Sequence, residues 1–344
     1  TFGTGPTTVF LWSQMHGDES TATMALADIL SWLGAPGRDA LRDTLAARLT
    51  VVMLPMLNPD GAELFQRENA VGVDVNRDVR RLSTAEARTL KAVRDSIKPA
   101  FGFNLHDQNA RTLGRPGGQR VGIALLAPAA DVENGFGPTR SAARLVAARI
   151  RTVLEREIPG RIARYDDAFN ARAFGDLFQH WGTSTVLIES GGLPDDPDKQ
   201  RLRTVNVIAI LSALDAIATG EYKNEDPDVY SSLPVNDRSA VDVVVTGASL
   251  VIPGQPPVRV DISMNYEDPL RKGRARVREI GDLDEVVAFD TIAAPGLFIH
   301  PDASMLTEQR GNRWLRLGAV VQLSIRRGPE VTSALVREIR GNDR

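Results

Sequence analysis

The order of apolar segments changes abruptly near residue 220, and this change limits the possible fold more than any other feature. Before that point, short apolar runs alternate with stretches of helical periodicity. Runs such as TTVFLW, RLTVVMLPML, FGFNLH and STVLIES are typical of buried strands. Strands that alternate with helices predict an α/β fold, in which a largely parallel or mixed sheet is flanked by helices. We therefore expect one layered domain over residues 1–220.

The rest of the chain has a different pattern. Segments such as AVDVVVTG, PVRVDISMN, RARVREIG and VVQLSIRR are short and strand-like, and turn signals separate them. We expect residues 234–344 to form a small all-β domain, either a sandwich or a partial barrel. The polar stretch between the two domains, residues 221–233, contains Pro, Asp and Asn and is predicted to be a linker.

Composition excludes several kinds of site. The 344 residues include no cysteine, so thiol catalysis and disulfides are excluded, and any metal must be held by His, Asp or Glu. The formal charge of −3 gives no argument for a nucleic-acid surface. No apolar run approaches the roughly 18 residues that would suggest a membrane span. The chain begins at Thr1, close to a strand, and we expect a leader or part of a domain upstream.

Two of the four histidines lie at the ends of predicted strands. His16 follows TTVFLW and is joined by Glu19, and His106 ends FGFNLH. A hydrolytic zinc site uses three nitrogen or oxygen ligands and leaves the fourth position open. Functional sites in α/β folds collect at the carboxyl ends of strands. A single His-x-x-Glu is more often an ordinary loop, but the matching position of His106 favours a metal site.

Two further segments carry suitable chemistry. Glu189 ends the apolar run STVLIES and could deprotonate a water molecule, although an exposed Glu at a strand end is the plain alternative. The segment NPDGAELFQRENAVGVDVNRD brings Arg67, Asp74, Asn76 and Arg77 into one region. Arginine suits a carboxylate or an oxyanion, whereas surface arginines and an Asx-turn are the alternatives here.

Taken in order, these motifs resemble the zinc carboxypeptidases of the M14 type. The resemblance rests on HGDE, NPDG, GVDVNR, NLH and IES, and it covers about residues 7–220. It implies a central eight-stranded mixed sheet flanked by helices and one Zn²⁺ held by His16, Glu19 and His106.

The resemblance also implies a role for each remaining motif residue. Glu189 would be the general base that activates the water at the zinc, and Arg67 would stabilise the oxyanion. Asn76 and Arg77 would bind the terminal carboxylate of the substrate. Asp74 would orient the first zinc histidine.

The chain departs from the family pattern in three places. The sequence starts too late to contain the first pair of family strands, so we expect either that these strands lie upstream or that the sheet is shorter. Tyr165, in RYDDAFN, stands near the position of the family's mobile substrate-binding tyrosine without matching it cleanly. In the segment that would line the specificity pocket, Arg172 and Asp176 are either pocket residues or charges on a helix surface.

We therefore predict hydrolysis of a C-terminal peptide bond, with a peptide or peptide-like substrate that has a free carboxylate. The nearest alternative is a zinc-dependent deacylase of N-acyl amino acids, of the aspartoacylase and succinylglutamate desuccinylase type. A catalytically inactive binding protein is a further alternative, with the β domain as its working part. Export to the periplasm or the medium is expected from the family, although the composition fits the cytoplasm as well.

Overall fold

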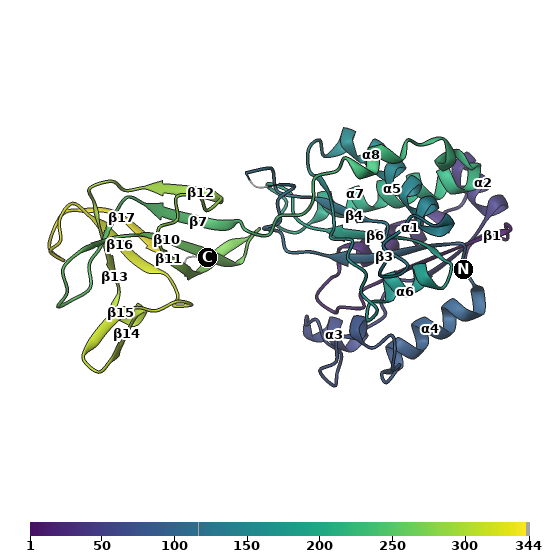
Figure 1. Cartoon of the computed structure of the whole chain (residues 1–344). Helices are drawn as coiled ribbons and strands as arrows, with labels where there is room; N and C mark the ends of the chain where they lie inside the picture. The colour runs from purple at the N-terminus through teal and green to yellow at the C-terminus, as the bar shows by residue number, and fades with distance from the viewer. Residues whose placement is uncertain (116, 342–344) are drawn as a thin grey trace. The chain divides into compact units, whose positions relative to one another are not determined.

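The computed structural model describes residues 1–115 and 117–341 and divides into two compact units, Thr1–Asn236 and Asp237–Arg344. Each unit has a hydrophobic core of its own. The first unit is an α/β layered structure, and the elements of the second are almost all strands (Figure 1).

A six-stranded mixed sheet forms the centre of the first unit. Its strands are β1 (Thr7–Ser13), β2 (Leu49–Leu54), β3 (Phe101–Asp107), β4 (Ile123–Leu126), β5 (Ile162–Arg164) and β6 (Ser184–Ser190). The strand order is β2-β1-β3-β6-β4-β5. The first four strands in this order are parallel, β4 is antiparallel to β6, and β5 is parallel to β4. The predicted mixed sheet is confirmed, but within the described part of this unit it has six strands rather than eight.

Helices cover both faces of this sheet (Figure 1). They are α1 (Thr21–Leu33), α2 (Ala40–Arg48), α3 (Pro59–Leu64), α4 (Ala85–Ile97), α5 (Pro138–Glu157), α6 (Phe174–His180), α7 (Gln200–Thr219) and α8 (Pro227–Ser231), with 3₁₀ turns η1 (Val75–Arg77) and η2 (Glu221–Asn224). One core joins α1, α5 and α7 to side chains such as Phe103 and Leu105. A second core joins α4 and α6 to Phe10 and Trp12 on the opposite face. The period-2 alternation along each strand produces these two faces.

One helix of the described chain, α7, is long and apolar enough by composition to cross a membrane. Half of this helix is buried inside the protein, where it contributes Leu202, Ile210 and Leu214 to the larger core of the first unit.

The predicted linker over residues 221–233 is wrong. These residues form η2 and α8 and belong to the first unit, which continues to Asn236. Asp226 caps α8 through its side chain, and Pro227 occupies the first turn. Tyr230 is buried, and its hydroxyl oxygen accepts the amide hydrogen of Ala127 at 3.0 Å. The polar residues that suggested a linker are therefore helix-start signals.

The second unit contains two larger sheets over one core. Its strands are β7 (Val241–Thr246), β8 (Ser249–Leu250), β9 (Val258–Arg259), β10 (Asp261–Asp268), β11 (Lys272–Gly281), β12 (Ala288–Ala293), β13 (Phe298–Pro301), β14 (Leu306–Gln309), β15 (Asn312–Leu315), β16 (Gln322–Arg326) and β17 (Leu335–Arg340), with one 3₁₀ turn, η3 (Ala303–Met305). Sheets β11-β10-β7-β12 and β17-β16-β13-β8-β9 share the core through residues such as Val245, Ile262, Ile299 and Ile325. This arrangement is a β-sandwich.

Candidate metal centre

Three neighbouring strands deliver polar side chains to one edge of the sheet. Strands β1, β3 and β6 are adjacent and parallel, so their carboxyl ends lie together. His106 near the end of β3 pairs in register with Glu189 of β6, which places both side chains on the same face. His16 lies just beyond the end of β1 and is buried, as are His106 and Glu189.

The loop between β1 and α1 is shaped so that His16 and Glu19 face the same point. Gln14 adopts a left-handed conformation with φ 52°, and the Glu19 amide donates to the His16 carbonyl at 3.2 Å. Gly17 packs directly on the backbone of α3, because a Cβ at this position would lie 1.9 Å from the carbonyl carbon of Gly61. Only glycine can therefore occupy position 17, between His16 and Glu19, and still make this contact with α3.

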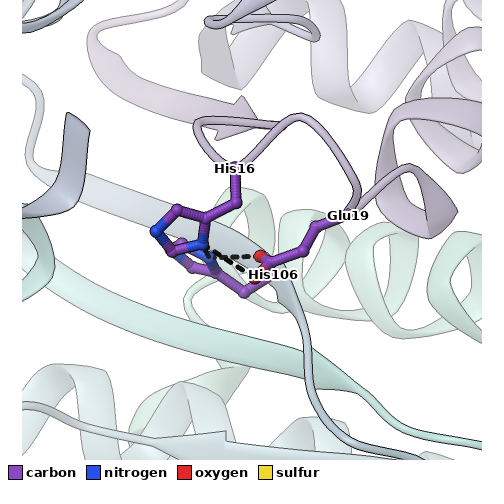
Figure 2. Close-up of side chains that lie close together, drawn as sticks. All are labelled: His16, Glu19 and His106. Atoms are coloured by element: carbon purple, nitrogen blue, oxygen red, sulfur yellow. Dashed lines mark hydrogen bonds and ion pairs between the residues drawn. The ribbon is translucent and has the colours of Figure 1, made fainter. Parts of the chain in front are cut away.

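The three candidate ligands converge through their nitrogen and oxygen atoms (Figure 2). Nδ1 of His16 lies 2.7 Å from Oε1 of Glu19, and Nδ1 of His106 lies 2.6 Å from Oε2 of Glu19. The two Nδ1 atoms are 3.2 Å apart. In Figure 2, His16 and Glu19 project from one loop toward His106 on the strand beside it.

This donor set suits zinc. Tetrahedral Zn²⁺ with bonds of about 2.0–2.1 Å places neighbouring ligand atoms roughly 3.3 Å apart. The 3.2 Å between the two Nδ1 atoms is close to that value, whereas the 2.7 and 2.6 Å from these atoms to Oε1 and Oε2 of Glu19 are shorter. A small outward movement of Glu19 would therefore accommodate the ion. Two imidazoles and one carboxylate are also the ligand types that zinc prefers when cysteine is absent.

Electrostatics in this cluster favour an ionised Glu19 between the two rings. Burial alone would raise the pKa of the Glu19 carboxyl, but the charge and hydrogen bonds of His106 and His16 hold it well below its usual range. Burial would lower the pKa of His16, yet hydrogen bonds to Asp74 and Glu19 raise it to about 9. Burial lowers the pKa of His106. A buried charge without a partner would be costly, and here the charges compensate one another.

Asp74 and Arg67 form the next layer around the donor atoms. Nε2 of His16 lies 3.1 Å from Oδ1 of Asp74, and Oδ2 of Asp74 accepts from Nε and Nη2 of Arg67 at 3.1 and 3.0 Å. Nη1 of Arg67 lies 3.4 Å from Oε1 of Glu19. The Arg67 side chain is 39% exposed, whereas those of His16 and Glu19 are 3% and 10% exposed. The cluster is therefore open to solvent on the side of Arg67.

Asn76 and Arg77 lie on the turn that Asp74 caps. The side chain of Asp74 accepts from the Asn76 amide at 2.9 Å at the start of η1. Oδ1 of Asn76 accepts from the amide of Phe174, the first residue of α6, at 2.8 Å. Nη1 of Arg77 donates to the Asn76 carbonyl at 2.7 Å. One short turn thus carries all three residues and fixes them near His16.

Tyr165 directly follows β5, which is two strands away from β6 in the sheet order. Its amide donates to Leu125, and its ring packs beside Val121, Ala124 and Ala163. Since β4 pairs with β6, Ala124 is the register partner of Glu189, and Tyr165 lies beyond it across the sheet. Its proposed part in substrate binding stays a prediction.

Asn58 is a site residue whose role the sequence did not predict. The fully buried Asn58 caps α3 by accepting from the Gly61 amide at 2.9 Å, and its Nδ2 donates to the Met15 carbonyl at 3.2 Å. Its own amide donates to Gln14 at 3.0 Å. The NPDG motif therefore braces the loop that carries His16. The position of Asn58 directly after the predicted strand RLTVVMLPML was the sequence signal that could have identified it.

The other histidines belong to different surroundings. Nδ1 of His180 lies 2.9 Å from the Ala130 carbonyl on an exposed part of α6, and Nε2 of His300 lies 3.1 Å from the Gly328 carbonyl in the second unit. A group of Asp261, Asp282 and Asp284 also lies close together, but both oxygens of Asp261 already accept backbone amide hydrogens.

Comparison with known proteins agrees with this geometry. Residues 3–103 match the family model described as zinc carboxypeptidase. A probable carboxypeptidase 2 from Arthroderma benhamiae is 31% identical over 107 residues, which cover 31% of this chain and 20% of that protein. Carboxypeptidase 2 from Trichophyton tonsurans is 28% identical over 152 residues, which cover 43% of this chain and 27% of that protein.

A solved metallo-carboxypeptidase from Burkholderia cenocepacia has the same fold, with a TM-score of 0.51 and 18% identity over 64% of this chain and 60% of that one. Carboxypeptidase A from Helicoverpa armigera gives a TM-score of 0.50 and 13% identity over 62% of this chain and 61% of that one. Over residues 3–103 the chain resembles the zinc carboxypeptidase family. The carboxypeptidase fold is that of the first unit, since the matched segment and the mixed sheet both lie there.

The family match and the geometry cover different parts of the site. The segment that matches the family model includes His16, Glu19 and Arg67 but stops before His106 and Glu189. Those two residues join the candidate centre through the register of β3 and β6. The matched segments are also a small part of the two carboxypeptidase relatives, at 20% and 27% of their lengths.

Proposed function

We propose that the first unit is a zinc-dependent metallocarboxypeptidase that hydrolyses the C-terminal peptide bond of a peptide or peptide-like substrate. The observation that carries this proposal is the convergence of His16, Glu19 and His106 beside Glu189 at the carboxyl ends of three parallel strands. The match of residues 3–103 to the zinc carboxypeptidase family model supports the same activity.

Each ligand and catalytic group has a defined task in the proposal. His16, Glu19 and His106 would hold one Zn²⁺, which supplies a Lewis acid for the scissile carbonyl and lowers the pKa of water. Glu189 accepts the proton of the attacking water and delivers it to the leaving amine. The buried position of Glu189 beside His106 supports this role, because a base must be near both the water and the carbonyl.

Arg67 and the η1 turn would bind the substrate. Arg67 reaches the cluster from its solvent-exposed side and can donate to the oxyanion that develops during attack. Asn76 and Arg77, on the turn that Asp74 caps, can bind the terminal carboxylate, since an amide and a guanidinium are both donors to carboxylate oxygens. This pair would make the enzyme an exopeptidase.

A substrate panel tests the reaction type. We expect hydrolysis of peptides with a free C-terminal carboxylate and at least about a hundredfold slower hydrolysis of the same peptides when they are amidated. Preference for N-acyl amino acids over peptides would instead identify a deacylase. Zinc binding without hydrolysis of either class would indicate a binding protein.

Substitution of Glu189 tests the mechanism. Glu189→Gln keeps the size of the side chain and removes the base, so we expect unchanged zinc content and a kcat lower by about two to four orders of magnitude. Metal analysis and kinetics on the same preparation measure both quantities. Retained turnover would show that another group accepts the proton.

For the second unit we propose an accessory role, because all the proposed site residues lie in the first. We also propose that the protein acts outside the cytoplasm. The cysteine-free composition is compatible with this compartment, and cell fractionation with an antibody to the chain would test it.

A further inference from the structure

A buried ion-pair cluster lies directly behind the proposed zinc ligands. Its centre is Asp107, the last residue of β3 and the neighbour of His106. Oδ2 of Asp107 accepts from Nζ of Lys199 at 2.8 Å and from the hydroxyl of Thr21 at 2.5 Å. The Asp107 side chain is 10% exposed and that of Lys199 is 24% exposed. We call Thr21, Asp107 and Lys199 the clasp.

Two members of the clasp, Asp107 and Thr21, lie next to the proposed ligands. The backbone amide of Asp107 donates to Oε2 of Glu19 at 3.1 Å, and the same oxygen lies 2.6 Å from Nδ1 of His106. Thr21 begins α1, two residues after Glu19, and is almost fully buried. A change in the position of Asp107 would therefore displace two proposed ligands. It would displace His106 because the two residues are adjacent in the chain, and Glu19 because the Asp107 amide donates a hydrogen bond to it.

Lys199, the third member of the clasp, belongs to the segment that follows Glu189, the proposed base. Lys199 is the N-cap residue of α7 and closes the loop that follows β6, the strand of Glu189. It adopts a left-handed conformation with φ 53°, and its amide donates to Asp196 at 3.1 Å. Asp107 itself pairs in register with Ser190, the residue after Glu189. The clasp thus joins α1, β3 and the loop after β6 at one carboxylate.

We propose that Lys199 and Thr21 are positioning residues for the metal centre, acting through Asp107 on Glu19 and His106. The inference rests on the proposed function, because it takes these two residues to be zinc ligands. Lys199 supplies the counter-charge that keeps the buried Asp107 carboxylate in place. Thr21 supplies the second donor and sets the start of α1. Neither residue contacts the reacting atoms.

The test measures zinc affinity of the metal-free full-length chain by competition with a chromophoric chelator at one fixed pH. Lys199→Met keeps the aliphatic stem and removes the charge, and we expect a zinc dissociation constant higher by about 10- to 100-fold. Thr21→Val removes the hydroxyl at nearly constant volume and should act in the same direction. Lys199→Arg and Thr21→Ser retain the donors and should restore the affinity to within about threefold.

Arg203 offers a matched control. It lies on the same helix, α7, and its Nε donates to Oδ2 of Asp28 on α1 at 2.6 Å. Arg203→Met removes an ion pair between the same two helices without touching Asp107. We expect a zinc affinity equal to that of the wild type, even where the melting temperature of the metal-free protein falls as far as in Lys199→Met.

The outcomes separate this inference from the function on which it rests. Wild-type zinc affinity in both Lys199→Met and Thr21→Val overturns it, and so does an equal loss of affinity in Arg203→Met. A wild-type chain that binds no zinc overturns both proposals. Zinc binding that depends on the clasp, in a chain that hydrolyses no peptide, supports this inference and contradicts the proposed function. If Lys199→Met does not fold, Thr21→Val and its serine control decide the matter.

Discussion

Asp74 makes contact with three proposed site residues at once. One oxygen accepts from the Asn76 amide and faces Nε2 of His16, and the other accepts two hydrogen bonds from Arg67. Burial would raise the pKa of this carboxyl, but His16 and Arg67 hold it well below its usual range. A carboxylate in this position fixes the imidazole orientation and leaves Nδ1 of His16 directed at the cluster.

Asp74→Asn should therefore weaken zinc binding more than it weakens the fold. The amide can still cap η1 through its oxygen, but its NH₂ group would face the donors of Arg67. We expect a zinc affinity lower by about 10- to 100-fold and a further loss in kcat/KM, measured by chelator competition and peptide hydrolysis. Asp78→Asn is the matched control, because Asp78 is a buried carboxylate of the same segment that accepts from the Thr84 amide at 2.7 Å. Equal zinc affinity in the two variants would contradict the role of Asp74.

Asp176 should make stability depend on pH. Burial raises the pKa of its carboxyl to about 6, against the opposing effect of a hydrogen bond from the Asn170 amide. A folded-state pKa above the unfolded value of 3.8 means that the folded protein binds this proton more tightly. The ionised carboxyl thus destabilises the fold as pH rises from about 4 to 6, and this penalty is complete at higher pH.

Asp176→Asn removes this titration and can keep the hydrogen bond at 2.9 Å from the Asn170 amide. We expect the variant to be more stable than the wild type by about 1–2 kcal/mol at pH 7.5 and nearly equal at pH 4. Urea unfolding at the two pH values measures the difference. A gain of the same size at both values would rule out ionisation of Asp176 as its cause.

At the scale of elements, the sequence predicted those parts of the site that follow strand ends. Apolar runs placed His16, His106 and Glu189 at carboxyl ends, and the parallel order of β1, β3 and β6 confirms that these ends meet. Parallel strands impose this proximity whatever the loop sequences are.

Other parts of the fold could not be predicted because they depend on distant contacts. Lys199 reaches Asp107 across 92 positions of sequence, and no local pattern marks that pair. The start of α4 shows the same limit: Ser83 and Glu86 have the spacing of a capping box, but Thr84 caps the helix and Glu86 accepts from Asn69. Composition alone also could not distinguish the helical residues 227–231 from a linker, because Asp and Pro serve both.

The loop between β1 and α1 has no room for a side chain at Gly17. Gly17 lies between His16 and Glu19 and abuts α3 so closely that a methyl group would overlap the Gly61 backbone at 1.9 Å. Gly17→Ala must push α3 or the loop aside, so we expect a loss of about 3 kcal/mol or more in unfolding free energy. We also expect weaker zinc binding, because the two ligands would separate. Urea unfolding and chelator competition measure these effects.

Gly135→Ala controls for the substitution itself. No heavy atom lies within 4 Å of a Cβ at Gly135, and its backbone is not in the left-handed region. We expect equal or slightly higher stability in this variant, since alanine restricts the unfolded chain. If Gly17→Ala is as stable as Gly135→Ala, the contact between the loop and α3 does not limit the sequence.

At the scale of the whole molecule, the end of the first unit is defined by specific bonds. The Asn236 amide donates to Arg164 at 3.0 Å, and Nδ2 of Asn236 donates to Gln108 at 2.7 Å, two residues beyond His106. Tyr230 of α8 joins the main core and accepts from Ala127. The residues after 220 are thus part of the first unit, and a domain boundary at residue 220, as the composition suggested, would remove them.

The boundary at Asn236 predicts that two fragments of the chain, residues 1–236 and residues 1–220, differ in stability. Residues 1–236 contain every proposed ligand and catalytic residue together with both cores of the first unit, so we expect this fragment to fold, bind zinc and keep kcat/KM within about threefold of the full chain. Residues 1–220 lack α8 and expose the surface that Tyr230 covers, and we expect this fragment to lose several kcal/mol of stability. Thermal unfolding and peptide hydrolysis compare the two. A 1–236 fragment that folds and binds zinc but no longer hydrolyses peptides would show that the β unit takes part in catalysis, because the loss could not then come from the metal centre.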